Sequence, residues 1–203
     1  MAQTIELEEP GIAKWLFTSK SAAWIWLVAR VWLGYQWLHA GWEKVIGYSG
    51  GTYTWKFGIT DESWLRSTAG LKGFVGFALQ GAGGEHAAVN YGWYAAFLRW
   101  LEHGGAWLAP VIAIGEVLIG LGLILGALTA VAAFFGGLLT VSFGLAGVAG
   151  VNPLFFVVEV FLILAWRNAG YYGLDRYLLP ALGTPWQRGK VFQKQNGAQV
   201  VTT

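Results

Sequence analysis

Apolar residues are concentrated in four stretches of this chain, and each stretch has the pattern of a membrane-crossing helix. The stretches are residues 21–44, 106–126, 128–149 and 152–168. A hydrocarbon core of about 30 Å needs about 20 apolar residues of helix, and the fourth stretch is the shortest candidate. The pattern predicts an all-α fold, in which residues 1–203 form a single membrane domain built on a four-transmembrane-helix bundle.

The connection between the first two stretches is unusually long and aromatic. Residues 45–105 should lie outside the cytoplasm, and within them 90–103 carry apolar side chains at helical spacing. Residues 64–79 are a second, glycine-interrupted candidate, and both patterns predict interfacial helices. A connection of this kind is expected either to cap the bundle or to dock a partner. Residues 1–20 and 169–203 are a polar arm and a polar tail.

The cations that flank the apolar stretches gather toward the two ends of the chain. Two precede the first stretch and five lie at or beyond the end of the last, while the connections between the second, third and fourth stretches carry none and the four cations of residues 45–105 are offset by four acids. The positive-inside rule therefore places both termini in the cytoplasm, which an even number of spans requires. The first 20 residues lack the pattern of a cleaved signal peptide. The seven cations at the two ends are Lys14, Lys20, Arg167, Arg176, Arg188, Lys190 and Lys194.

Composition narrows the possible chemistry. The chain is 56% hydrophobic and only 12% charged, which is too apolar for an ordinary soluble domain. It has no cysteine, and its three histidines lack ligand spacing, so no metal, haem or iron–sulfur cluster is expected. No nucleic-acid signature is present. Redox chemistry would therefore need a bound organic cofactor, such as a quinone, or a partner subunit.

Three charged residues lie within the apolar stretches and away from the stretch ends: Arg30, Glu116 and Glu159. A charge in hydrocarbon costs several kcal/mol unless it is paired or reaches water. These residues either hold helices together or line a site, and we expect Arg30 to meet the two carboxylates near mid-bilayer. One arginine satisfies one carboxylate fully, so the second acid should be protonated. That acid would serve proton transfer to or from a quinone, or would only hydrogen-bond a backbone carbonyl.

The first apolar stretch has a narrow stripe of special residues. Arg30, Gly34, Trp37, Gly41 and Lys44 follow one another at spacings of four, three, four and three. These spacings place them on one helix face, where glycines allow a neighbouring helix to approach closely. Most of the 13 tryptophans are expected to be interfacial anchors, but Trp37 lies on this stripe and is the candidate for contacting a cofactor ring.

Three short motifs resemble the DoxX family of membrane proteins. They are ARVWLG at 29–34 with AGWEK at 40–44, GEVLIG at 115–120 with LILG at 123–126, and NAG at 168–170 with GLDR at 173–176. The matches bracket residues 22–186, and segment 45–105 is longer than the connection in compact members. The resemblance implies a four-helix membrane bundle of the prokaryotic cytoplasmic membrane, and it carries over Arg30, Lys44 and Glu116 as site residues. Glu159 is added by the burial argument alone.

The resemblance also implies a function. Relatives include DoxD, the membrane subunit of thiosulfate:quinone oxidoreductase, so we expect a subunit of a redox system that passes electrons from thiosulfate or another sulfur compound to quinone. Trp37 and Lys44 are the expected cofactor contacts, and Arg30, Glu116 and Glu159 the expected catalytic groups. Two alternatives stay open: a non-catalytic accessory subunit that binds membrane or extracytoplasmic protein partners, and a proton or small-solute pathway.

Overall fold

Every regular element that the structure describes is helical. The computed structural model describes residues 10–47, 57–80, 88–148 and 150–183. Within these ranges the prediction of an all-α fold is confirmed. The elements are α1 (Gly11–Thr18), the 3-10 turn η1 (Lys20–Ala22), α2 (Ala23–Ile46), α3 (Ala69–Leu79), α4 (Gly92–His103), α5 (Leu108–Leu125), α6 (Thr129–Leu145), α7 (Asn152–Leu164) and α8 (Asp175–Leu182).

Helices α2, α5, α6 and α7 correspond to the four apolar stretches. Among the described residues, only α5 is both long and apolar enough to cross a membrane, with a mean hydropathy of 2.4. Helix α2 is longer but less apolar, and α6 and α7 are apolar but shorter. Four helices that alternate in direction are therefore present, and one of them meets the criteria for a membrane span by itself.

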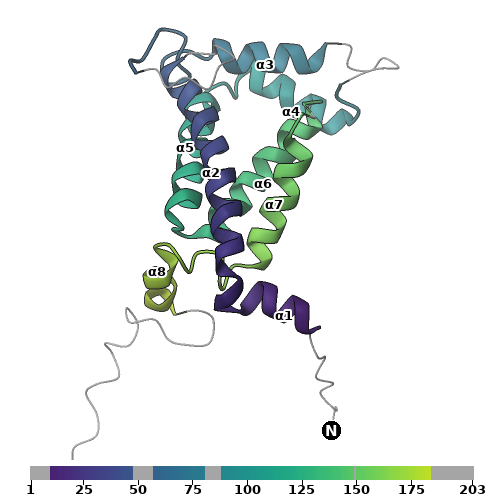
Figure 1. Cartoon of the computed structure of the whole chain (residues 1–203). Helices are drawn as coiled ribbons and strands as arrows, with labels where there is room; N and C mark the ends of the chain where they lie inside the picture. Colours follow the sequence, from purple (N-terminus) through teal and green to yellow (C-terminus); the bar gives the residue numbers. More distant parts are fainter. Residues whose placement is uncertain (1–9, 48–56, 81–87, 149, 184–203) are drawn as a thin grey trace, which may run out of the picture.

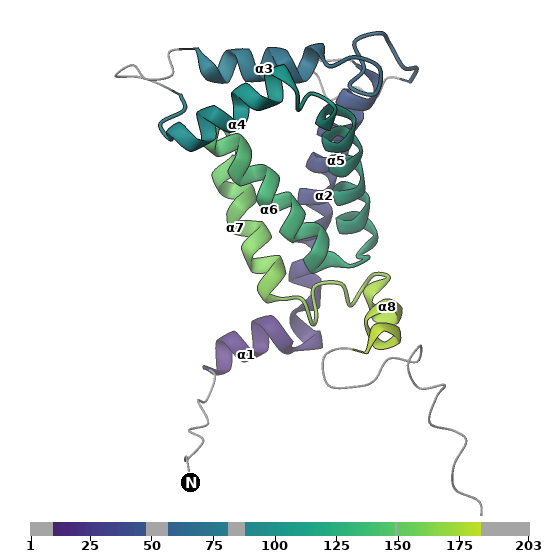
Figure 2. The same cartoon turned by 180° about the vertical axis from the view of Figure 1, so that it is seen from behind.

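The four long helices form two pairs. Helix α2 packs along α5 and α6 packs along α7, as Figures 1 and 2 show. The pairs converge near α1 and α8 and separate toward the other end, which α3 and α4 cross. We call these the α1/α8 end and the α3/α4 end. The helices predicted within residues 64–79 and 90–103 are present as α3, which begins only at Ala69, and α4, and both cover one end of the bundle.

Glycine allows the close approach of α2 and α5. A Cβ on Gly120 would lie 2.6 Å from Leu38 Cα, and one on Gly34 would lie 2.9 Å from the Gly120 carbonyl oxygen. A Cβ on Gly41 would similarly meet the backbone nitrogen of Val117. The predicted glycine stripe therefore faces a neighbouring helix, and that neighbour is α5.

Two apolar cores stabilise the bundle. One lies among α3, α4 and the adjoining ends of α5 and α6, and the other among α2, α5, α6 and α7. The Tyr94 hydroxyl links α4 to α6 by donating to the Ser142 carbonyl at 2.5 Å, and burial raises the pKa of Tyr94. The outward faces of α5, α6 and α7 keep large apolar side chains exposed, including Leu118, Phe135 and Phe156.

Candidate functional site

A buried ion pair joins α2 to α5 toward the α3/α4 end. Lys44 Nζ lies 2.5 Å from Glu116 Oε2; the Glu116 side chain is fully buried and that of Lys44 is 22% exposed. Lys44 also donates to the Ala40 carbonyl at 3.4 Å. The second carboxylate oxygen, Oε1 of Glu116, is buried and has no hydrogen-bond partner among the described residues. The pair thus combines a proton donor with a carboxylate that can still accept a hydrogen bond.

Trp64 and Phe143 flank this pair. Lys44 Nζ lies 5.5 Å from the centre of the Trp64 ring and 5.9 Å from that of Phe143. Gly70 makes room for the indole, because a Cβ there would collide with Trp64 Nε1. Two aromatic faces toward one ammonium stabilise it in an apolar setting. Neither aromatic residue was predicted, because both are distant from Lys44 in sequence.

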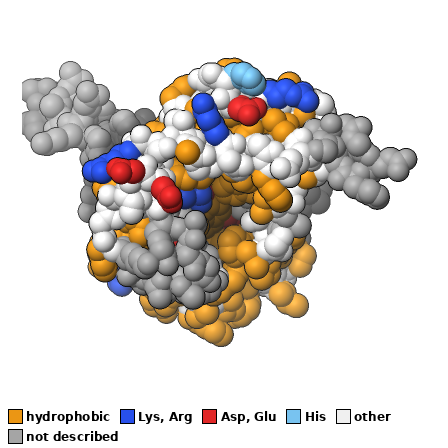
Figure 3. Space-filling model, turned by 90° about the horizontal axis from the view of Figure 1, so that it is seen from above, with side chains coloured by type: hydrophobic (Ala, Val, Ile, Leu, Met, Phe, Trp, Pro, Cys, Tyr) orange, Lys and Arg blue, Asp and Glu red, His pale blue; other side chains and the backbone are white. Residues whose placement is uncertain are grey.

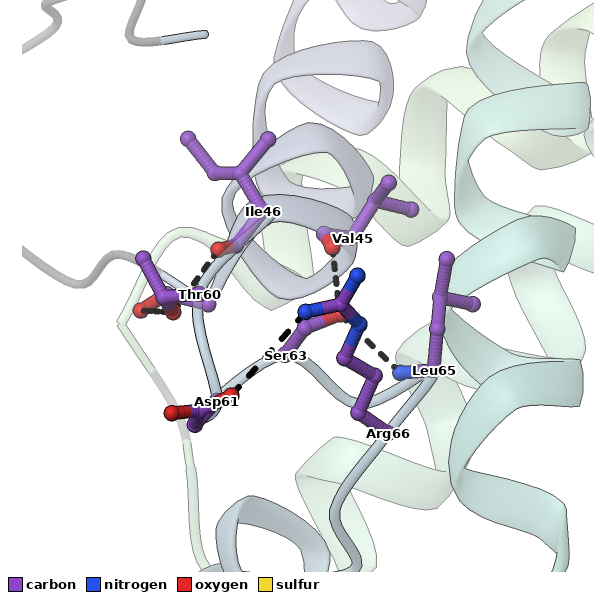
Figure 4. A network of polar contacts seen from close by, with 8 residues as sticks. Val45, Ile46, Thr60, Asp61, Ser63, Leu65 and Arg66 are labelled. Carbon is purple, nitrogen blue, oxygen red and sulfur yellow. Dashed lines mark hydrogen bonds and ion pairs between the residues drawn. The ribbon is translucent and has the colours of Figure 1, made fainter. Parts of the chain in front are cut away.

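The loop that carries Trp64 is attached to the carboxyl end of α2 (Figure 4). Thr60 Oγ1 donates to the Ile46 carbonyl at 2.9 Å, and Ser63 Oγ donates to the Val45 carbonyl at 2.5 Å. The Trp64 backbone N–H donates to the Lys44 carbonyl at 3.0 Å. The last carbonyls of a helix lack partners within the helix, so this loop caps α2 while it places Trp64 beside Lys44.

Two hollows of different character meet at Trp64. Toward the α3/α4 end lies a recess of about 560 Å³ whose lining includes charged side chains, and seen from that end the molecule has a hollow with charged side chains along one side (Figure 3). Glu43 and Glu62 line this recess together with Lys44. Between α5 and α6 lies an apolar groove of about 680 Å³, which Trp64 and Phe143 also line. The pair therefore lies near the junction of a recess that has charged lining residues and a groove that has almost none.

Glu159 forms a second, separate buried site. Its Oε1 accepts a hydrogen bond from Trp37 Nε1 at 3.0 Å and one from Thr140 Oγ1 at 3.1 Å, and the residue is fully buried. Gly136 makes room for the carboxyl, because a Cβ there would lie 2.8 Å from Oε1. The predicted inward orientation of Glu159 is therefore observed, with neutral donors as its partners. Trp37, which was predicted to contact a cofactor ring, is one of those two donors.

The expected meeting of Arg30 with Glu116 and Glu159 is wrong. Arg30 Nη1 donates to the carbonyls of Leu123 and Ile124 at 2.6 and 2.7 Å, and Nη2 donates to the Tyr172 carbonyl at 3.0 Å. The reason is register: Arg30 is near the start of α2 and faces the carboxyl end of the antiparallel helix α5. Carbonyls at a helix end need donors, and a guanidinium supplies five.

Asp175 completes the structure around Arg30. It accepts hydrogen bonds from the backbone N–H groups of Leu128 and Thr129 at 2.6 and 2.9 Å, at the start of α6. The negative charge of Asp175 also attracts the guanidinium of Arg30. The α5–α6 turn is thus held by a cation at one helix end and an anion at the other. Asp175 belongs to the GLDR motif at 173–176, and the motif alone predicts no role for it.

The remaining candidate groups are distributed elsewhere. His39 is buried, and its Nδ1 lies 3.9 Å from Glu43 Oε1 one turn away. In the described ranges, no three His, Asp or Glu residues gather in a way that could hold a metal ion. His86 lies outside the described residues. The structure brings together Lys44 and Glu116 from the predicted set and leaves Arg30, Trp37 and Glu159 at other places.

The Lys44–Glu116 pair can therefore exchange a proton with a polar group placed beside it. An ammonium donates a hydrogen bond or a proton to a carbonyl or oxyanion, and an adjacent carboxylate can take up a proton from water and pass it to the amine. Comparisons of this chain with protein-family models, with characterised proteins and with solved structures found no match.

Proposed function

We propose that this chain is a four-span membrane protein related to the DoxX family, and that it serves as the membrane subunit of a redox system that reduces a quinone beside Lys44 and Glu116. The observation that carries the proposal is this buried pair, which lies beside an apolar groove and is formed by two residues of the family-like motifs. Quinones are dissolved in the bilayer, so an apolar approach to a proton donor suits them.

The membrane part of the proposal is supported by surface character. The outward faces of α5, α6 and α7 expose leucine, valine and phenylalanine in numbers that suit contact with lipid. Helix α2 has 24 residues, or about 36 Å at 1.5 Å per residue, and α5 is apolar enough to span by itself. With α1 and α8 at the cytoplasmic face, the α3/α4 end lies outside, as the distribution of cations predicts.

The chemistry needs protons as well as electrons. Reduction of a quinone to a quinol consumes two electrons and two protons, and oxidation of two thiosulfate ions to tetrathionate releases two electrons. Lys44 can supply one proton to a quinone oxygen; Glu116 can then take up a proton from water and pass it to the amine, and a second such transfer completes the quinol. Thiosulfate as the donor rests on the family resemblance. Because the chain has no cysteine, electrons reach the quinone directly from the donor or through a partner subunit.

The test compares two buried carboxylates. The protein is purified in a gentle detergent, and thiosulfate-dependent reduction of a quinone analogue is followed by absorbance. Glu116→Gln should lower the rate by about 100-fold, a typical loss for a removed acid–base group. Glu159→Gln should keep a rate near that of the unmodified protein, because the amide oxygen still accepts from Trp37 and Thr140. Assays are run well below the melting temperature of each variant.

Each other outcome has a meaning. Equal, full activity in both variants removes the proton role of Glu116. Absence of activity in the unmodified protein, with stable co-purification of a larger complex, favours the accessory-subunit alternative, for which the exposed Trp93 and Trp100 of α4 offer a contact surface. Proton flux into liposomes without any electron donor favours the third alternative, a proton or small-solute pathway.

A further inference from the structure

The α1/α8 end of the molecule carries positive charge without matching negative charge. Four described cations have exposed side chains there: Lys14, Lys20, Arg167 and Arg176. The one described acid at this end, Asp175, is buried and accepts hydrogen bonds from the backbone N–H groups that begin α6. Among the described residues, no carboxylate lies within ion-pair distance of these four cations. An anion that approached this end would therefore meet cations that no described acid neutralises.

Two of these cations meet at one aromatic ring. Lys20 Nζ lies 5.4 Å and Arg176 Cζ lies 5.5 Å from the ring centre of Tyr171. Each cation is attracted by the ring, but the two like charges that share it repel each other. An anion that contacted both cations would remove this repulsion. Lys20, Tyr171 and Arg176, which we call the cation–tyrosine cluster, are thus a candidate anion site.

Hydrogen bonds fix the two segments that carry the cations of this cluster. Asn168 Nδ2 donates to the carbonyls of Leu16 and Ser19 at 3.0 and 2.8 Å, and this fixes the corner between α1 and η1. The backbone N–H of Asp175 donates to the Gly126 carbonyl at 2.7 Å, and this fixes the start of α8. The tyrosine of the cluster lies in the chain between these two anchor points. The backbone therefore brings the two cations together, although they are far apart in sequence.

The helices next to the cluster carry exposed apolar and aromatic side chains. Ile12 and Trp15 of α1 are exposed, and so are Tyr177 and Leu182 of α8. Arg176 Cζ also lies 6.0 Å from the ring centre of Tyr177. Basic residues beside tyrosine and tryptophan are typical of the level of lipid head groups. A free anion would leave these apolar side chains in water, whereas a lipid layer would cover them, so the surface favours a phosphate that belongs to a lipid.

From these observations we infer that the cation–tyrosine cluster binds the phosphate of an anionic phospholipid. Lys20 and Arg176 donate to the phosphate oxygens, as an ammonium and a guanidinium do in charge-assisted hydrogen bonds. The inference rests on the membrane part of the proposed function, because it needs a lipid layer at the α1/α8 end, and it is independent of the redox chemistry. The cytoplasmic leaflet, where the proposed topology places this end, is the one that carries a negative surface potential.

The experiment compares two pairs of cations at opposite ends of the molecule. Lys20→Gln with Arg176→Gln removes the charges of the cluster, and Lys72→Gln with Arg99→Gln removes one lysine and one arginine from α3 and α4 as the matched control. The full chain is purified in a non-ionic detergent, and binding of phosphatidylglycerol is titrated by native mass spectrometry, with zwitterionic phosphatidylcholine for comparison. A cation near an anionic lipid surface contributes about 1 kcal/mol, or about fivefold, so the first variant should bind phosphatidylglycerol about 25-fold more weakly and the control should bind it normally.

Two further variants separate charge from folding. Lys20→Arg with Arg176→Lys exchanges the cations and keeps their charge, so it should keep most of the affinity for phosphatidylglycerol. Lys20→Gln alone should weaken binding about fivefold and covers the case in which the double variant does not fold. The inference is overturned if removal of the cluster charges leaves the affinity unchanged, or if the α3/α4 control loses as much. Equal binding of phosphatidylcholine, or displacement of the lipid by inorganic phosphate, overturns it as well.

The outcomes separate this inference from the proposed function. Native membranes are first washed with alkaline carbonate, which removes proteins that are not embedded. A chain that is washed off rejects the membrane part of the proposed function, and this inference with it. A chain that stays embedded but binds phosphatidylglycerol independently of the cluster rejects this inference alone. Binding that depends on the cluster, in a chain that reduces no quinone, supports the lipid site and rejects the redox assignment.

Discussion

At the scale of single residues, the partners of the two cations on α2 explain why each can be buried. Lys44 meets a carboxylate, and Arg30 meets carbonyl oxygens at the end of α5. Both lie on the same stripe of α2, but they are 14 residues apart, or about 21 Å along the helix. A charged residue inside an apolar stretch therefore indicates that a partner exists. The position of the charged residue along the helix decides which group that partner is.

The ion pair leads to a prediction about stability. Glu116→Gln leaves the ammonium of Lys44 in an apolar setting without its counter-charge. Breaking a buried pair costs about 3–5 kcal/mol, and the partial exposure of Lys44 lowers this to about 2 kcal/mol. The melting temperature in detergent should fall by about 5 °C. The double variant Lys44→Met with Glu116→Gln should recover part of this loss, since no unpaired charge remains. A double variant less stable than the single one would contradict this account.

At the scale of elements, the α2–α5 contact positions the site. Gly34, Gly41 and Gly120 bring the two backbones together, and the close contact of Gly41 with the Glu116 region sets the level at which Lys44 faces its carboxylate. The loop that caps α2 then adds Trp64 (Figure 4). The geometry of the pair therefore depends on helix packing and on the cap more than on either charged residue.

Gly120→Ala tests this contact. Its new Cβ would meet the backbone of Leu38, which cannot move without separating the helices. We expect a loss of about 1–3 kcal/mol, typical of an overpacked interior. Gly144→Ala is the control: its Cβ would meet open space, and alanine favours a helix by about 1 kcal/mol over glycine. Thermal unfolding followed by circular dichroism measures the effect. The melting temperature of Gly120→Ala should be lower than that of the unmodified protein, and that of Gly144→Ala should be equal or higher.

At the scale of the whole molecule, the proposed topology places α3 and α4 on one side of the membrane and α1 and α8 on the other. The four long helices alternate in direction, so the first and last described helices, α1 and α8, lie at the same end of the bundle (Figures 1 and 2). Two apolar cores and the exposed apolar faces between them suit a bundle that is bounded by water at both ends and by lipid around its middle.

Single cysteines test this topology, because the natural chain has none. Phe57 is 82% exposed at the α3/α4 end, and Tyr177 is 69% exposed on α8. Phe57→Cys should react with a membrane-impermeant maleimide in intact cells, whereas Tyr177→Cys should react only after the cells are opened. The cysteine-free parent measures background labelling. Reaction of both residues in intact cells, or of Tyr177→Cys alone, would rule out the proposed orientation.

Much of the architecture was accessible from the sequence because it depends on local signals. Apolar runs and their breaks lie close to the bounds of α2, α5, α6 and α7, and Gly126 ends α5 in a left-handed conformation that glycine adopts readily. The amphipathic spacing in residues 90–103 likewise marks α4. The glycine stripe on α2 was readable for the same reason: residues three and four apart share a face whatever the rest of the chain does.

The composition of the candidate site was only partly accessible. Lys44 and Glu116 were expected from motifs, but their pairing was not, and Arg30 was assigned to carboxylates that it does not contact. Trp64, Phe143, Thr140 and Asp175 were missed as partners, since each comes from another element. One helical turn of register, about 5.4 Å, is enough to exchange one partner for another.

The sequence by itself thus determined which segments are helical and which helix faces carry small or charged residues. It also determined that buried charges must have partners. The tertiary structure alone decided that Lys44 meets Glu116, that Arg30 and Asp175 hold the α5–α6 turn, and that an apolar groove leads to Trp64. The physical reason is range: helix formation and face composition depend on residues a few positions apart, whereas partners and cavities depend on how whole helices pack against one another.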